Sequence, residues 1–133
     1  MHKKLINPEE LYDGSANGMS QAVQEIQSNL LFISGQVAWD KNFQVTATTM
    51  EEQLKQALTN LDRVLAASNA SVENLVHVKI YVRGEVADHM EALQPVIFQY
   101  LGTSRPSLTG IGVASLASPE TLVEVEAIAS VYS

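Results

Sequence analysis

The chain has 133 residues, 46% of them hydrophobic, which suits a single domain with one core. Fifteen acidic against eight basic residues give a net charge of −7, which argues against nonspecific nucleic-acid binding. The absence of cysteine excludes disulfides, thiol catalysis and Cys-ligated zinc. No apolar run approaches the ~20 residues that cross a bilayer, and no secretory signal follows the first lysines. We therefore expect a cytoplasmic protein that does not bind membranes.

The first third predicts a loop and two short strands. Residues 12–20 are rich in Gly, Ser and Asn, which is typical of a loop. Residues 22–39 indicate two strands with a turn at Ser28-Asn29. The continuous apolar run Leu30–Ile33 predicts a strand that is buried on both faces.

Residues 48–67 predict an amphipathic helix that covers a sheet. Thr48 and Glu51 match a capping box, and Glu51 stands four residues before Lys55, the favoured order for an ion pair. Spacings of three and four residues place seven apolar side chains on one face: Met50, Leu54, Ala57, Leu58, Leu61, Val64 and Leu65. The outer face is expected to carry Glu52, Gln56, Asn60 and Arg63.

Residues 75–83 alternate as a β-strand does. One predicted face carries Val76, Val78, Ile80 and Val82, and the other carries His77, Lys79, Tyr81 and Arg83. Such a polar face is either exposed to solvent, as in many antiparallel sheets, or buried against another subunit or in a cleft.

Residues 85–101 predict a second helix, which Gly102 ends. Pro95 interrupts this pattern. Either the helix bends at Pro95, or a short turn precedes a helix that has Pro95 in its first turn.

The last third predicts two strands, at residues 107–116 and 121–132, separated by a break at Ser118-Pro119-Glu120. The second alternates, with Val123, Val125, Ala127, Ala129 and Val131 on one side and Glu124, Glu126, Ile128, Ser130 and Tyr132 on the other. The order of elements predicts an α+β layer in which two helices cover one face of a mixed sheet. Because the uncovered face is half apolar, we expect self-association.

Glu124 and Glu126 are the strongest candidates for chemistry. They lie two apart on one strand, about 7 Å between Cα atoms, and point the same way. They are either a base that holds water or part of a solvated sheet face. The three histidines lack metal-ligand spacing, so we expect no metal site, and no phosphate-binding loop is present.

Five segments in order resemble the YjgF family, also called the RidA (reactive intermediate deaminase) or endoribonuclease L-PSP family: GMSQAV, FISGQVAWD, QLKQALTNLDRVLAASNASVENLVHVKIYV, RPSLTGIGV and LVEVEAIA. The likeness runs from Gly18 to Ala129, so residues 1–133 are expected to form one domain of this kind. The resemblance implies a chorismate-mutase-like α+β fold and a homotrimer with three clefts between subunits for small, usually carboxylated ligands. It also implies cofactor-independent hydrolysis of enamines and imines to 2-oxo acids and ammonia.

The resemblance assigns part of the catalytic site to this chain. Glu124 corresponds to the glutamate that positions water, and Ser34 and Gly35 belong to the family's ligand-binding motif. Gln94 stands where an asparagine is frequent. Met19 stands where active members have a tyrosine.

The arginine that holds the substrate carboxylate in active members is replaced here by Leu108, followed by Thr109. Arg105 lies three residues earlier, before Pro106. On a strand this odd offset points Arg105 to the opposite face, so it is expected to be a poor substitute unless the chain bends at Pro106. Loss of a buried Arg–carboxylate contact costs about 2–5 kcal/mol of binding free energy.

Two functions follow as hypotheses. The cleft hydrolyses or binds a less anionic metabolite than the usual 2-imino acids, with Glu124 as the base, or the protein is a non-catalytic ligand-binding or regulatory trimer. The net charge of −7 and the lack of a histidine pair argue against ribonuclease activity, and we expect no nucleic-acid partner.

Overall fold

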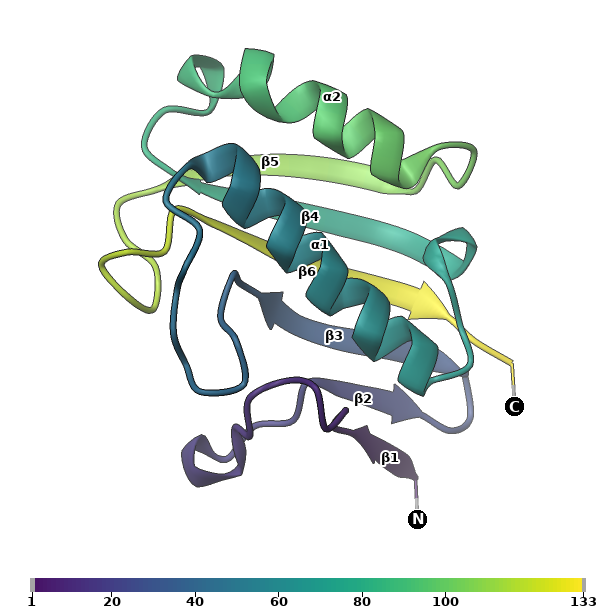
Figure 1. Ribbon diagram of the computed structural model, residues 1–133. Helices are drawn as coiled ribbons and strands as arrows, with labels where there is room; N and C mark the ends of the chain where they lie inside the picture. Colours follow the sequence, from purple (N-terminus) through teal and green to yellow (C-terminus); the bar gives the residue numbers. More distant parts are fainter. Residues whose placement is uncertain (1, 133) are drawn as a thin grey trace.

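The computed structural model describes residues 2–132, which form one mixed six-stranded sheet with two helices on one face (Figure 1). The strand order is β1-β2-β3-β6-β4-β5; β4 and β5 run parallel, and every other neighbouring pair is antiparallel. The predicted α+β fold is therefore confirmed. The strands are β1 (Lys3–Ile6), β2 (Ala22–Glu25), β3 (Leu30–Gln36), β4 (Leu75–Arg83), β5 (Ser107–Val113) and β6 (Val123–Ser130). The helices are α1 (Met50–Ala67) and α2 (Met90–Leu101), with 3₁₀ turns η1 (Ser15–Asn17), η2 (Val72–Asn74) and η3 (Val86–Asp88).

The core lies between the sheet and the helices. From β6 it takes Val123, Val125, Ala127 and Ala129, while Glu124, Glu126, Ile128 and Ser130 are half-buried on the open face. The predicted alternation of this strand is thus confirmed. In residues 2–132 no helix has the length and apolar character needed to cross a bilayer.

The expectation that Leu30–Ile33 is buried on both faces is wrong. Leu31 and Ile33 are buried, but Phe32 between them is 46% exposed. The cause is the position of the helices, which cover only one face of the sheet, so that alternate residues of β3 face the open side.

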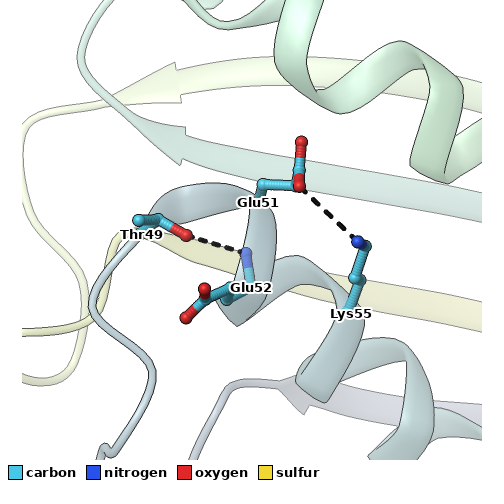
Figure 2. Close-up of polar contacts among 4 residues, drawn as sticks. All are labelled: Thr49, Glu51, Glu52 and Lys55. Atoms are coloured by element: carbon cyan, nitrogen blue, oxygen red, sulfur yellow. Dashed lines mark hydrogen bonds and ion pairs between the residues drawn. The ribbon is translucent and has the colours of Figure 1, made fainter.

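The N-cap of helix α1 lies one residue later than predicted. Thr49 is the N-cap, in an extended conformation, and its Oγ1 accepts a hydrogen bond from the Glu52 backbone N–H at 3.1 Å (Figure 2). The predicted capping box at Thr48 and Glu51 is therefore wrong, and the cap is the single Thr49 hydrogen bond. The ion pair is confirmed, with 3.5 Å between Lys55 Nζ and Glu51 Oε2 (Figure 2).

The apolar face of α1 is as predicted, since six of its seven residues are buried and Met50 packs against them. Asn60, however, was expected on the outer face and is only 2% exposed. Its Nδ2 donates hydrogen bonds to the backbone carbonyls of Val37 and Trp39, at 2.9 and 3.2 Å. Asn60 thus ties α1 to the segment after β3.

Strand β4 departs from simple alternation at its start. A register irregularity lies between Leu75 and His77, and Val76 is 48% exposed, so the prediction that it shares a face with the buried Val78 is wrong. Leu75 is buried instead, and alternation resumes with Val78. One irregular position is enough to change face, because side chains of a strand alternate with period two.

Helix α2 combines parts of both predicted alternatives. The 3₁₀ turn η3 precedes it, and Pro95 lies inside the helix, beyond its first turn. Gly102 ends the helix with φ 52°, in the region that favours glycine.

Candidate functional site

Glu124 lies on the open face of the sheet, where β6 runs between β3 and β4. Its carboxylate makes no hydrogen bond within residues 2–132. No side-chain polar atom in this range is both buried and unpaired, so the carboxylate oxygens are accessible. Partial burial, and secondarily the charge of Glu126, raise the pKa of Glu124. An accessible carboxylate with raised proton affinity is suited to general-base chemistry.

Glu126 lies two residues further along β6 but is already engaged. Its Oε1 accepts a hydrogen bond from the Tyr81 hydroxyl at 2.9 Å. This bond is the main reason why the pKa of Tyr81 is raised. Of the two carboxylates, therefore, Glu124 is the one free to bind a ligand or water.

Gly35 makes room for Glu124. A Cβ atom at position 35 would lie 2.5 Å from the Glu124 Cδ and Oε2 atoms. Between Ile33 and Gln36 the pairing of β3 with β6 shifts register, which is a β-bulge. Gly35 in this bulge lets the backbone pass directly beneath the carboxylate, a close approach that only glycine permits.

Ser34 secures the bulge to the preceding chain. Its backbone N–H donates to the Gln21 carbonyl at 2.9 Å, and its Oγ donates to the Ser20 carbonyl at 2.7 Å. Gln21 is itself buried and accepts a hydrogen bond from Gln36 Nε2 at 3.0 Å. The role of Ser34 seen here is to hold the backbone beside Glu124.

Sequence analysis missed Tyr12, which the fold brings to the same region. Its hydroxyl lies 4.0 Å from the Met19 sulfur, its carbonyl accepts from Gln21 Nε2 at 3.0 Å, and its ring packs 5.1 Å from that of Trp39. Burial raises the pKa of Tyr12, and the charge of Glu124 raises it further. A lone tyrosine at the start of a loop carries no local signal, and its contact with Trp39 arises only in the folded structure.

Leu108, Gln94 and Arg105 form a separate group at the β5 edge of the sheet, beside α2. All three line an open hollow of about 420 Å³. Leu108 also lines an apolar hollow of about 250 Å³ and pairs with the buried Val78, so it faces the helix side of the sheet. Thr109 pairs with Lys79 and therefore faces the open side.

The predicted direction of the Arg105 side chain assumed that this residue lies on a strand, and it does not. Strand β5 begins at Ser107, and Arg105 has φ 46°, in the left-handed region. The chain thus bends before Pro106, and Arg105 lines the same hollow as Leu108. No metal-binding cluster of three His, Asp or Glu residues occurs between residues 2 and 132.

The candidate residues thus fall into two groups. Glu124, Gly35, Ser34 and Met19 lie near the β3–β6 bulge, and Gln94, Leu108 and Arg105 lie between α2 and β5. Glu124 lies on the open face of the sheet and Leu108 faces its helix side, so the two groups lie on opposite faces.

Comparison with known proteins supports the predicted family. The family model described as Endoribonuclease L-PSP matches residues 13–131. The mitochondrial protein mmf2 of Schizosaccharomyces pombe is 33% identical over 98% of this chain and 99% of its own. A 2-iminobutanoate/2-iminopropanoate deaminase of Capra hircus is 33% identical over 83% of this chain and 77% of its own.

The fold is shared with solved structures of the same group. A Rid-family protein of unknown function from Yersinia pestis, YyfB, superposes with a TM-score of 0.73 at 34% identity, covering 98% of this chain and 100% of that one. Together with the family match over most of the sequence, this identifies the chain as a member of the Endoribonuclease L-PSP family, the YjgF/RidA family that its motifs resemble.

Proposed function

We propose that this protein hydrolyses a small reactive imine or enamine, other than the usual 2-imino acids, in clefts between the subunits of a homotrimer. The observation that carries the proposal is Glu124, a half-buried carboxylate with a raised pKa and no hydrogen-bond partner in residues 2–132. Relatives of this chain that are named 2-iminobutanoate/2-iminopropanoate deaminases support the reaction class.

The chemistry needs no group beyond the side chains and water. Glu124 accepts a proton from water as the water oxygen bonds to the imine carbon, and the C=N π electrons move to nitrogen. Protonated Glu124 then returns the proton to nitrogen. Glu124 next accepts the proton of the new hydroxyl group and passes it to the amino nitrogen, so that the C–N bond breaks, neutral ammonia leaves, and the carbon becomes a carbonyl. A carboxylate with raised pKa suits these proton transfers.

The need for a second copy rests on the separation of the two residue groups. Glu124 lies on the open face of the sheet and Leu108 faces its helix side, so a site that uses both requires a neighbouring subunit. The half-apolar open face, which includes Phe32, is the surface we expect the subunits to bury. Light scattering should give about three times the 14.5 kDa chain mass.

Leu108 sets the expected substrate range. A leucine offers no hydrogen bond to a carboxylate at the position where active relatives have arginine. Ammonia release from 2-iminobutyrate, generated in place, should therefore be slow for the parent protein and faster for Leu108→Arg.

The catalytic role of Glu124 is tested with any imine that the unmutated parent protein hydrolyses. Glu124→Gln should lower ammonia release at least 100-fold, whereas Glu126→Gln, a matched change two residues away, should lower it less than tenfold. Equal effects of the two variants would remove Glu124 from its proposed role. Fast turnover of 2-iminobutyrate by the parent would overturn the proposed substrate range.

The alternative is a non-catalytic ligand-binding or regulatory trimer, which the apolar Leu108 also favours. It predicts no ammonia release from any imine by either parent or Leu108→Arg. Ligands would still raise the melting temperature, and Glu124→Ala would reduce that shift.

A further inference from the structure

A hollow of about 720 Å³ lies where the chain before η1 meets the loop that follows β3. Residues from the stretch 7–15 form one side of it, and residues 41–43 form the other. Two aromatic side chains, Tyr12 and Phe43, line it together with two carboxylates, Glu9 and Asp13. Aromatic rings and carboxylates both attract a cation, so this lining combines two kinds of attraction for one class of ligand.

The aromatic wall of the hollow is a cluster of three rings. The centroid of the Tyr12 ring lies 5.1 Å from that of Trp39 and 5.0 Å from that of Phe43. The Trp39 and Phe43 centroids are 5.8 Å apart, and Trp39 Nε1 donates a hydrogen bond to Thr121 Oγ1 at 3.3 Å. Tyr12 is buried, whereas Phe43 is 47% exposed. Phe43 is therefore the ring that a ligand in the hollow reaches most easily.

The loop after β3 holds Phe43 in place. Its φ of 62° is left-handed, which is uncommon for a bulky residue. Asp40 imposes this conformation, because its Oδ1 accepts hydrogen bonds from the backbone N–H groups of Asn42 and Gln44, at 2.8 and 2.9 Å. The Asp40 carbonyl also accepts one from the Phe43 N–H at 3.1 Å.

A buried polar network holds Tyr12 on the other side. The Tyr12 carbonyl accepts a hydrogen bond from Gln21 Nε2 at 3.0 Å, and Gln21 Oε1 accepts one from Gln36 Nε2 at 3.0 Å. Both glutamines are buried. The two rings are thus positioned before any ligand arrives, so binding costs little side-chain entropy.

The charged groups of the lining are net negative. Glu9 is exposed and forms no ion pair within residues 2–132. Asp13 Oδ1 accepts a hydrogen bond from the Ser15 backbone N–H at 2.9 Å, which lowers the pKa of Asp13 and keeps it charged at neutral pH. Of the described residues that line the hollow, only Lys41 is basic, so the carboxylates outnumber the ammonium groups. The hollow therefore disfavours anions.

We propose that this hollow binds a small organic cation of the alkylammonium class, with its alkylated nitrogen against Phe43 and Tyr12 and its charge balanced by Glu9 and Asp13. An alkylated nitrogen suits the rings better than a primary ammonium, which is strongly hydrated and finds no hydrogen-bond acceptor on a ring face. This is a second site, and it does not rest on the proposed hydrolysis.

Titration of the full chain with choline, followed by tryptophan fluorescence, tests the proposal. Trp39 is the single tryptophan of the chain and contacts both rings of the hollow, so its emission reports occupancy. The neutral isostere 3,3-dimethylbutan-1-ol, which has the same shape without the charge, should bind about tenfold more weakly, and ethanolamine should also bind more weakly than choline. Choline affinity should fall with added salt, because Glu9 and Asp13 are exposed.

Matched variants separate the contribution of the ring from that of the charge. Phe43→Leu should weaken choline binding about fivefold, because leucine keeps the bulk but has no π face, and Phe43→Tyr should retain it. Phe98→Leu, which removes an exposed ring from α2, should change nothing. Glu9→Gln should also weaken choline about fivefold, whereas Glu10→Gln, which removes a neighbouring charge outside the lining, should have a much smaller effect.

No binding of choline, or equal binding of choline and its neutral isostere, would overturn the proposal. Equal losses in Glu9→Gln and Glu10→Gln would also overturn it, since the net charge of the chain and not the hollow would then attract the cation. If Phe43→Leu lowers the urea midpoint, Phe43→Tyr takes its place, and loss of choline binding in a stable Phe43→Tyr contradicts the role of the ring. Glu124→Gln should leave choline binding unchanged, so failure of the hydrolysis and failure of this site are told apart.

Discussion

Replacing Gly35 by alanine tests how the site positions its carboxylate. The new Cβ would lie 2.5 Å from the Glu124 Cδ and Oε2 atoms, closer than non-bonded atoms approach, so Glu124 must move. Gly35 does not have positive φ, so alanine adds no backbone strain of that kind. The obstacle is the end of a flexible side chain, which can leave its preferred rotamer at a cost of about 0.5–1.5 kcal/mol.

The expected result is a small loss of stability with a large loss of activity. Gly35→Ala should lower the free energy of unfolding by about 1 kcal/mol, measured by urea denaturation. Ammonia release from a turned-over imine should fall about 100-fold, because a displacement of roughly 1 Å at a reacting group has that effect. Gly110→Ala is the matched control, since its Cβ would make only a 3.7 Å contact, and it should change neither quantity appreciably.

A double-mutant cycle shows whether the clash is the cause. In the Glu124→Ala background the obstructing carboxylate is gone, so Gly35→Ala should cost almost nothing in stability. If Gly35→Ala costs as much in that background as in the parent, contact with Glu124 does not explain the glycine, and the reasoning fails.

Three further predictions follow from buried or strained groups. Asn60→Ala should lower the free energy of unfolding by about 1–3 kcal/mol, since the Val37 and Trp39 carbonyls lose their donor; an unchanged urea midpoint would contradict this. Arg105→Gly should raise it by about 1 kcal/mol through relief of the left-handed backbone, and a destabilised variant would refute the strain. Because the folded-state pKa of Glu124 is raised above its ordinary 4.5, the stability tied to this group is complete below pH 4.5 and is lost as pH rises through the folded-state pKa. Glu124→Gln should therefore melt higher than the parent at pH 7 and lose this advantage in acid; an advantage that does not change with pH would contradict the shift.

The predictions that were confirmed concern helices and strands whose apolar residues follow a regular spacing in the sequence. The apolar stripe of α1 and the alternation of β6 were read correctly, because each buries one continuous face against the core. The predictions that failed concern residues whose burial depends on contacts with segments distant in the sequence. Phe32 is exposed because the helices cover one face only, and Asn60 is buried because backbone carbonyls from another segment satisfy it.

The site was predictable to a similar extent. Glu124 and Gly35 carry a motif, and the structure supplies the reason for it in the contact that a Cβ would make. Tyr12 could not be found, because only tertiary packing brings its ring against that of Trp39. For Arg105 the sequence left two directions open, and its left-handed backbone agrees with the alternative in which the chain bends at Pro106.

The bulge at Ser34 and Gly35 has a consequence for how this protein can diversify. It positions the Glu124 carboxylate through the main chain, whereas the candidate residues Gln94, Leu108 and Arg105 line a hollow between α2 and β5. Substitutions in this hollow can therefore change which ligand fits without moving the Glu124 carboxylate. A hydrocarbon at 108 beside a guanidinium at 105 is the kind of variation that such a separation allows.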